Sequence, residues 1–292
     1  MNWNDVIHIL IDNARNYFVI AGLAFSIFYV LLKRKIFFKK IQMRFVKRKE
    51  YMREIIFSVV SIMIFTLPPV VMLKIDSIRQ HTTYYADIAT YGWLYFFAAF
   101  PIMLFVHDTY FYWLHRLIHH KALFRHIHLI HHKSTNPSPW AAYSFHPFEA
   151  ILEAGVFVLF LFIMPINDIH LLVVFIFSLT YNVYGHLGYE LYPKGFNKTW
   201  VGKWINTSVN HNMHHQYFKG NYGLYFTFWD RVMHTIHPDY DERFNEVKVR
   251  KKKRKFLKQL VDGSCLFFCL TFYQILAAPC CLFCIQPKIF IE

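Results

Sequence analysis

The sequence predicts an all-α integral membrane protein, a helical bundle of about four to five spans with a histidine-rich cap on its cytoplasmic side. Of the 292 residues, 55% are hydrophobic and 20% are aromatic, which is too apolar for an ordinary soluble domain and excludes a disordered or fibrous chain. Several stretches approach the roughly 20 apolar residues that cross a bilayer core as a helix. Histidines gather in short runs directly outside these stretches.

The predicted spans follow one another from the N-terminus. The first covers about residues 17–32 and the second residues 55–73, where Pro68 and Pro69 are expected to kink or end the helix. The third, residues 90–106, runs directly into His107 and Asp108. Two more stretches, residues 150–166 and 169–184, predict a helical hairpin that enters the membrane and returns to the same side.

Positive charge sets the expected orientation. The chain has 32 Lys and Arg against 18 Asp and Glu, and 18 of the 32 fall in residues 33–53 and 248–258. Two basic runs beside apolar segments are typical of cytoplasmic flanks and anionic headgroups rather than of nucleic-acid binding. We therefore expect a cytoplasmic active side, in a bacterial inner membrane or, in a eukaryote, the endoplasmic reticulum membrane.

The five cysteines are confined to the last 28 residues, so a metal site in the preceding 264 must use His, Asp or Glu. The Cys-rich stretch 264–285 is apolar enough to be a further span, and both possibilities stay open. These features divide the chain into N-terminal spans with a basic loop (1–89), a histidine-rich domain (90–240), and a basic run with an apolar tail (241–292).

Three histidine runs carry the strongest chemical signal. His115 and His119 are spaced i, i+4, and the pattern H-x-x-H-H occurs at residues 128–132 and again at 211–215. On a helix each set is expected to face one side. Eight imidazoles exceed the needs of one tetrahedral zinc, so two metals are the economical interpretation. Imidazole suits iron, zinc, copper and nickel, so the ligand type leaves the metal open.

The remaining histidines and the acidic residues have less specific interpretations. Neutral imidazole ligands need partners for their second nitrogen, and nearby carboxylates are Asp108, Glu149, Glu153, Glu190 and Asp230. We expect His8, His81 and His170 to contact solvent or headgroups, while His120, His126, His234 and His237 are intermediate. A zinc protease is disfavoured because the chain has no H-E-x-x-H. A metal transporter would place its ligands inside the spans.

These histidine motifs resemble those of the fatty acid hydroxylase/sterol desaturase superfamily of membrane-bound di-iron oxygenases, most closely sterol C5-desaturases and their bacterial relatives. The resemblance rests on HDTYFYWLHRLIH at 107–119, HLIHH at 128–132 and HNMHH at 211–215. Flanking stretches support it, namely STNPSPW at 134–140, FHPFE at 145–149 and NYGLYFTFWDR at 221–231. It covers roughly residues 90–237.

The resemblance implies a set of metal ligands. His186, in the stretch GHLGYE, matches a further family histidine, and Glu190 stands where some members carry another. Beside the ligands, the resemblance suggests supporting roles for Asp108, Glu190, Trp229 and Asp230, and for His146 either ligation or a supporting role. The implied iron ligands are His115, His119, His128, His131, His132, His186, His211, His214 and His215.

The implied chemistry is O2-dependent hydroxylation or desaturation of a lipid, sterol-like or fatty-acyl, at two iron ions, with no catalytic residues beyond the metal ligands. No segment resembles an electron-transfer module, so electrons are expected from a separate carrier, cytochrome b5-like or ferredoxin-like. Membrane lipids are the other expected partners. The alternative function is a metal-binding membrane protein, a transporter or sensor, without oxygenase activity.

Overall fold

The computed structural model describes residues 3–250. The predictions for the Cys-rich stretch 264–285 and for most of the second basic run lie outside the described residues.

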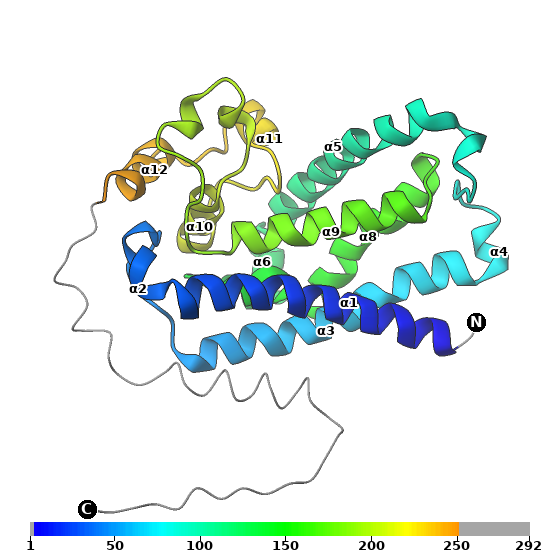
Figure 1. Ribbon diagram of the computed structural model, residues 1–292, viewed down its shortest axis with the longest axis horizontal. Coiled ribbons are helices and arrows are strands. Elements are labelled where there is room, and N and C mark those ends of the chain that lie inside the picture. The colour runs from blue at the N-terminus through cyan, green and yellow to red at the C-terminus, as the bar shows by residue number, and fades with distance from the viewer. Residues whose placement is uncertain (1–2, 251–292) are drawn as a thin grey trace, which may run out of the picture. The chain divides into compact units, whose positions relative to one another are not determined.

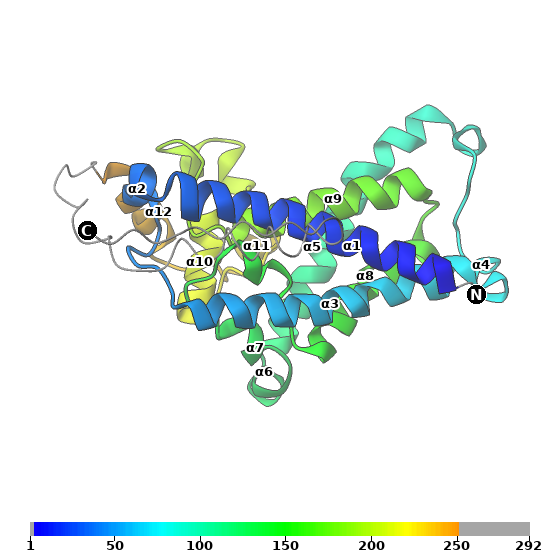
Figure 2. The same cartoon turned by 60° about the horizontal axis from the view of Figure 1, so that its bottom comes forward.

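Four described helical segments are long and apolar enough to cross a membrane, and the chain is a multi-pass membrane protein. They are α1 (Trp3–Phe25) with its π-helical continuation η1 (Ser26–Leu31), α3 (Arg48–Lys74), α5 (Gly92–Ile118) and α9 (Asp168–Gly185). Figures 1 and 2 show α1 and α3 side by side along most of their lengths. The predicted helical membrane bundle is therefore confirmed.

Three spans are longer than their apolar stretches predict. α1 already begins at Trp3, well before the predicted residue 17. α3 passes through Pro68 and Pro69 and ends at Lys74, so the proline pair does not end the helix. α5 passes through His107 and Asp108 to Ile118, because this polar end is buried within the protein rather than exposed at a membrane boundary. The continuous helix carries the first histidine motif from the span directly into the site.

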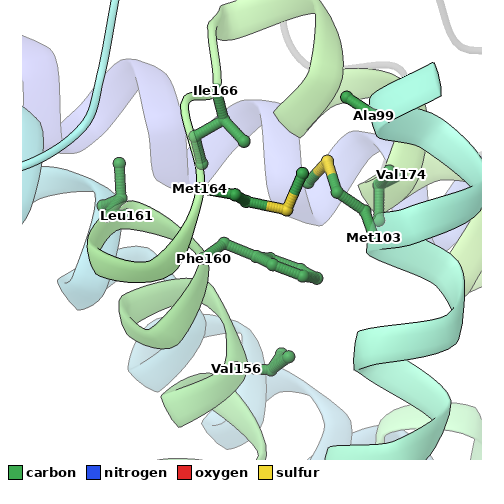
Figure 3. Packing of buried hydrophobic residues seen from close by; sticks show 8 residues of the cluster. All are labelled: Ala99, Met103, Val156, Phe160, Leu161, Met164, Ile166 and Val174. Carbon is green, nitrogen blue, oxygen red and sulfur yellow. The ribbon is translucent and has the colours of Figure 1, made fainter. Parts of the chain in front are cut away.

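The two stretches of the predicted hairpin form α8 (Pro147–Ile163) and α9, but α8, at 17 residues, is not among the four described helical segments long enough to cross a membrane. The turn between them is packed by an apolar cluster from α5, α8, α9 and the connecting loop, which includes Met103, Phe160 and Ile166 (Figure 3). The loop is also anchored to the segment that follows α3, since the Thr83 N–H donates to the Leu161 carbonyl at 2.7 Å.

His170 corrects one prediction from the sequence. Instead of contacting solvent or headgroups, it is fully buried in the first turn of α9. Its Nδ1 accepts from the Asn167 N–H, while Asn167 caps the helix by accepting from the His170 N–H. Its Nε2 donates to the Phe96 carbonyl at 2.8 Å. His170 therefore ties α9 to α5, because every polar atom of a buried ring needs a partner.

The segment between the second histidine motif and α8 lies inside the bundle. Its 3-10 helix η4 (Pro139–Tyr143) packs against α1, α3 and α9. The Trp140 carbonyl accepts from Tyr17 at 2.7 Å and from Ser58 at 2.9 Å, and the Ala142 carbonyl accepts from Asn182 at 2.8 Å. These side chains satisfy irregular backbone that is buried away from water.

Short helices complete the described chain. They are α2 (Lys33–Ile36), η2 (Phe37–Lys39), α4 (Asp76–Arg79), η3 (Ile88–Thr90), α6 (Lys121–Ile127), α7 (Leu129–His132), η5 (Phe196–Lys198), η6 (Gly202–Trp204), α10 (Ser208–Tyr217), α11 (Phe228–Val232) and α12 (Tyr240–Val249). Of these, α6, α7 and α10, together with the C-terminal ends of α5 and α9, position the histidines.

Candidate metal centre

The predicted histidines come from four separate segments. His115 is in the last turn of α5 and His119 is the residue that caps its end. The second motif begins at His128, between α6 and α7, and His131 and His132 belong to α7. His186 caps the end of α9.

The third motif lies on α10, a helix whose sequence is polar but whose surface is buried. Thr207 starts it by accepting a hydrogen bond from the Asn210 N–H, as an N-cap threonine does. Eight of its ten residues are buried, among them His211, His214 and His215. Burying this many polar groups is costly unless they are bonded or bind a ligand, so α10 has the character of a functional element.

The nine predicted ligands form two groups, and within each group the ligand nitrogens lie within 4.8 Å of one another. The five-histidine group combines α5, the second motif and α10. The four-histidine group combines the second motif, the end of α9 and α10. The first consists of His115, His119, His128, His132 and His214, and the second of His131, His186, His211 and His215.

This division adds to the expectation that each motif faces one side, because two of the three motifs supply both groups. Within the second motif, His131 belongs to the four-histidine group while its neighbours His128 and His132 belong to the other. Within the third motif, only His214 belongs to the five-histidine group. Each H-x-x-H-H motif therefore supplies ligands to both groups. The relative placement of α7 and α10 therefore sets the geometry of both groups at once.

Backbone carbonyls decide which ring nitrogen faces inward. His115 Nδ1 lies 2.9 Å from the Tyr222 carbonyl, His214 Nδ1 lies 2.7 Å from the Gly220 carbonyl, and His186 Nδ1 lies 2.8 Å from the Asn182 carbonyl. A carbonyl only accepts, so each Nδ1 carries the proton and donates it. The Nε2 of each neutral ring is then a bare lone pair.

These lone pairs converge. In the four-histidine group the Nε2 atoms of His186, His211 and His215 are 3.0, 3.1 and 3.2 Å apart. Each Nε2 has a single in-plane direction for a proton or a lone pair, so three mutual contacts cannot all be hydrogen bonds. Ligands about 2.0–2.1 Å from a common metal have neighbouring nitrogens roughly 3 Å apart. The spacing fits a shared metal ion.

The five-histidine group gives the same result. His115 Nε2 lies 3.0 Å from His128 Nε2, and His119 Nε2 lies 3.2 Å from His214 Nε2. His132 is 1% exposed, and neither of its ring nitrogens has a hydrogen-bond partner among the described residues. A buried polar ring without partners needs an explanation, and a metal ion bound to one nitrogen supplies it.

Burial keeps the rings neutral, as metal ligation requires. Desolvation lowers the pKa of His186 to about 4, and desolvation together with the nearby His115 lowers the pKa of His119 to about 2. The pKa values of His128, His131, His132, His211, His214 and His215 are also lowered well below their usual range, first by desolvation and then by neighbouring histidines.

One carboxylate contacts a predicted ligand directly. Glu149, in the first turn of α8, is 1% exposed, and its Oε1 lies 2.6 Å from His128 Nδ1. Burial raises the pKa of this carboxyl, so its ionised form needs positive charge nearby. A cation in the five-histidine group would supply that charge, and the carboxylate would orient His128 toward it.

Other acidic residues shape the backbone around the site. Asp230 accepts from the N–H groups of Tyr222 and Gly223 at 2.9 and 2.8 Å, and so holds the loop whose Tyr222 carbonyl accepts from His115. Asp108 accepts from three successive N–H groups, those of Leu224, Tyr225 and Phe226.

Glu190 accepts from Tyr184 and from the N–H groups of Tyr192 and Val209, which fastens the start of α10. Neither Glu190 nor Glu153 is part of either histidine group in the described residues.

The other candidates lie outside both groups. His146 is the N-cap residue of α8, and its ring accepts from the Phe148 N–H. Trp229 donates from Nε1 to the Thr109 hydroxyl on α5. The four intermediate histidines are also placed outside the groups, namely His120, His126, His234 and His237.

Sequence reasoning missed a contact from the basic loop. Gln42 is 6% exposed, and its side-chain N–H₂ donates to the Thr135 carbonyl at 2.7 Å and to Asn212 Oδ1 at 3.0 Å. Thr135 follows the second motif and Asn212 is inside the third, so one amide bridges both. The preceding Lys40 and Ile41 are also buried, contrary to a loop that only meets solvent or headgroups. Nothing in the local sequence of this lysine-rich loop signals the contact.

Comparison with known proteins matches the region that carries the site. The fatty acid hydroxylase family model matches residues 100–235, a range that contains all nine predicted ligands. Over this region the chain is similar to the fatty acid hydroxylase/sterol desaturase superfamily. No solved structure matches it.

Relatives within the superfamily are sterol enzymes by name. The chain is 29% identical over 222 residues to a lathosterol oxidase of Rattus norvegicus, covering 75% of this chain and 72% of that protein. It is 28% identical to a Delta(7)-sterol 5(6)-desaturase of Gibberella zeae, covering 72% and 64%. A Delta(7)-sterol 5(6)-desaturase of Aspergillus fumigatus is 30% identical, covering 60% and 61%. The alignments thus cover between 61% and 72% of the length of these relatives.

Proposed function

We propose that the nine histidines hold two iron ions and that the protein is a membrane-bound oxidoreductase for O2-dependent desaturation or hydroxylation of a lipid. The observation that carries the proposal is the convergence of bare Nε2 lone pairs into two buried groups. Imidazole is a suitable ligand for iron, and the superfamily supports iron over the other candidates. This evidence favours the oxygenase over a transporter or sensor.

The relatives suggest the substrate class. Because they are named lathosterol oxidase and Delta(7)-sterol 5(6)-desaturase, we propose a sterol-like lipid and formation of a carbon–carbon double bond. Desaturation with O2 removes two hydrogens from the substrate and reduces O2 to two waters. The substrate provides two of the four electrons, and a separate carrier, cytochrome b5-like or ferredoxin-like, provides the other two. The histidine-bearing end of the bundle then faces the cytoplasm, where such a carrier is available.

The bound irons would supply O2 activation and oxidation of an unactivated C–H bond. The protein's own groups prepare the site for that chemistry. Carbonyls of Asn182, Gly220 and Tyr222 hold the Nδ1 protons and so direct Nε2 inward. Burial of eight of the nine rings excludes water from the reacting region.

Metal analysis by mass spectrometry on protein purified in mild detergent tests the proposal. We expect about two irons per chain in the wild type. His131→Ala and His214→Ala each remove a ligand from a different group, so both should lower the iron content. His126→Ala is the matched control, because His126 is exposed and lies outside both groups. One zinc or no metal in the wild type, unchanged in both variants, would refute the oxygenase and favour a binding or transport role.

A product assay then tests the reaction. The iron-loaded protein is given a Delta(7)-sterol, O2 and a reducing system, and the products are analysed by mass spectrometry. Loss of two hydrogens is expected for desaturation, whereas gain of one oxygen would show hydroxylation. An iron-loaded protein that converts no sterol would leave the metal site intact but contradict the sterol substrate.

A further inference from the structure

Aromatic side chains form a strip on the surface beside the third span, which we call the aromatic edge. Trp204 contacts Phe228 with ring centroids 6.3 Å apart, Phe228 contacts Trp229 at 5.3 Å, and Trp229 contacts Trp113 at 5.6 Å. Trp200 lies on the turn that precedes Trp204 and is 81% exposed. The edge thus consists of Trp113, Trp200, Trp204, Phe228 and Trp229.

One side of the aromatic edge lies on the lipid-facing surface of α5. Phe105 of that span is half-exposed, and its ring lies 5.8 Å from Phe228. Trp229 donates to Thr109, one turn further along the same helix. At 1.5 Å per residue, Phe105 lies about 20 Å and Trp113 about 32 Å from the start of α5. With a hydrocarbon core about 30 Å thick, this is the level at which α5 leaves the hydrocarbon.

Cations accompany the rings. Lys203 Nζ lies 5.1 Å from the centre of the Trp204 ring, and the Arg231 guanidinium lies 5.8 Å from it. Arg231 is held in place, since its Nε donates to the Lys203 carbonyl at 2.8 Å. Tryptophan beside Lys and Arg is typical of the membrane–water interface, where the ring meets the acyl boundary and the cation meets phosphate.

We propose that the aromatic edge lies in the phospholipid headgroup layer of the bilayer that the chain's own helices span, and holds the histidine-bearing end against that surface. The occupant of the exposed Trp200 and Val201 surface is lipid, because the edge continues directly from the lipid-facing side of α5. The proposal concerns the protein surface and does not depend on the proposed reaction.

A chain of ring contacts connects the aromatic edge to the site. Trp229 stacks on Tyr112 at 6.1 Å, and Tyr112 contacts Tyr222 at 6.2 Å, whose carbonyl accepts from His115. The membrane contact therefore supports the same loop that orients one predicted ligand.

Tryptophan fluorescence tests the proposal on the full-length protein in phospholipid nanodiscs. One set of discs carries acyl chains brominated close to the headgroup, and a second set is titrated with aqueous acrylamide. The emission lost in Trp200→Phe, relative to wild type, reports Trp200. We expect that difference emission to be quenched several-fold more by brominated lipid than by acrylamide.

Trp140→Phe is the matched control, because Trp140 is 1% exposed and packs inside the bundle against Tyr17 and Phe25. Its difference emission should be protected from acrylamide. A Trp200 difference emission that acrylamide quenches and brominated lipid does not would overturn the proposal, since the edge would then face water or a soluble partner.

Discussion

The two histidine groups are built from the same motifs but differ in charge. In the five-histidine group, His128 meets the buried carboxylate of Glu149, and His119 is partly exposed. In the four-histidine group every ring is buried, and the Nδ1 atoms of His186 and His131 face the carbonyls of Asn182 and Ser144. A cation in the first group has an anionic partner, whereas one in the second is supported by neutral dipoles. Two metals with similar ligands therefore need not bind equally well.

Acid should produce the largest effect, and it should act on both groups. Burial lowers the pKa of His186 to about 4, below the value of about 6.5 for an exposed histidine. A lowered folded-state pKa means that stability is fully present above about pH 6.5 and is lost as the pH falls toward 4. Protons also displace metal from imidazole. Metal content and Tm, measured after buffer exchange across this range, should fall together. Two metals retained at pH 4 with an unchanged Tm would contradict this expectation.

Removing the charge of Glu149 should weaken metal binding in the five-histidine group more than in the four-histidine group. In Glu149→Gln an amide oxygen still accepts from His128, but the negative charge is lost. Replacing a partner of a metal-bound histidine typically weakens metal affinity about 10–100-fold. We expect a chelator to remove about one of the two metals from this variant under conditions in which the wild type keeps both.

Glu54→Gln is the matched control for that comparison. Glu54 is fully buried and accepts a hydrogen bond from Ser138, but it is part of neither histidine group. Its variant should keep both metals. If Glu54→Gln loses metal as readily as Glu149→Gln, the effect reflects general destabilisation and the charge difference between the groups has no consequence.

The sequence predicts which histidines belong to the site, but it does not predict how they are distributed between the two groups. The spacings at residues 128–132 and 211–215 are local, and histidine runs are rare, so membership of the site follows from pattern alone. The division does not follow, because the helix breaks at His128 and α10 is buried on all sides. The sequence also predicts five carboxylates as possible partners of the histidine rings. Only the tertiary structure shows that Glu149 contacts a ring, whereas Asp108 and Asp230 accept hydrogen bonds from backbone N–H groups.

Gln42 illustrates a contact that composition conceals. It lies in a run of lysines and arginines whose charge predicts a solvated or headgroup-facing loop. Its burial depends on the segment that follows α9. The Ile41 N–H donates to the Gly188 carbonyl at 3.0 Å, and this hydrogen bond holds the basic loop against the site. Such a contact joins residues 93 and 170 positions apart, which no local pattern encodes.

Gln42→Leu should have the smallest effect, and it should not distinguish the two groups. The variant leaves the Thr135 carbonyl and Asn212 Oδ1 without their donor, which costs about 1–3 kcal/mol of stability. Because the second and third motifs each supply both groups, loosening their connection should weaken both metals to a similar extent. Gln80→Leu is the control, since Gln80 is exposed and lies outside both groups. Chelator titrations of Gln42→Leu should therefore show two metals released in parallel, at lower chelator concentration than in the wild type or in Gln80→Leu. Loss of one metal alone would mean that Gln42 supports a single group, and the shared-motif explanation would fail.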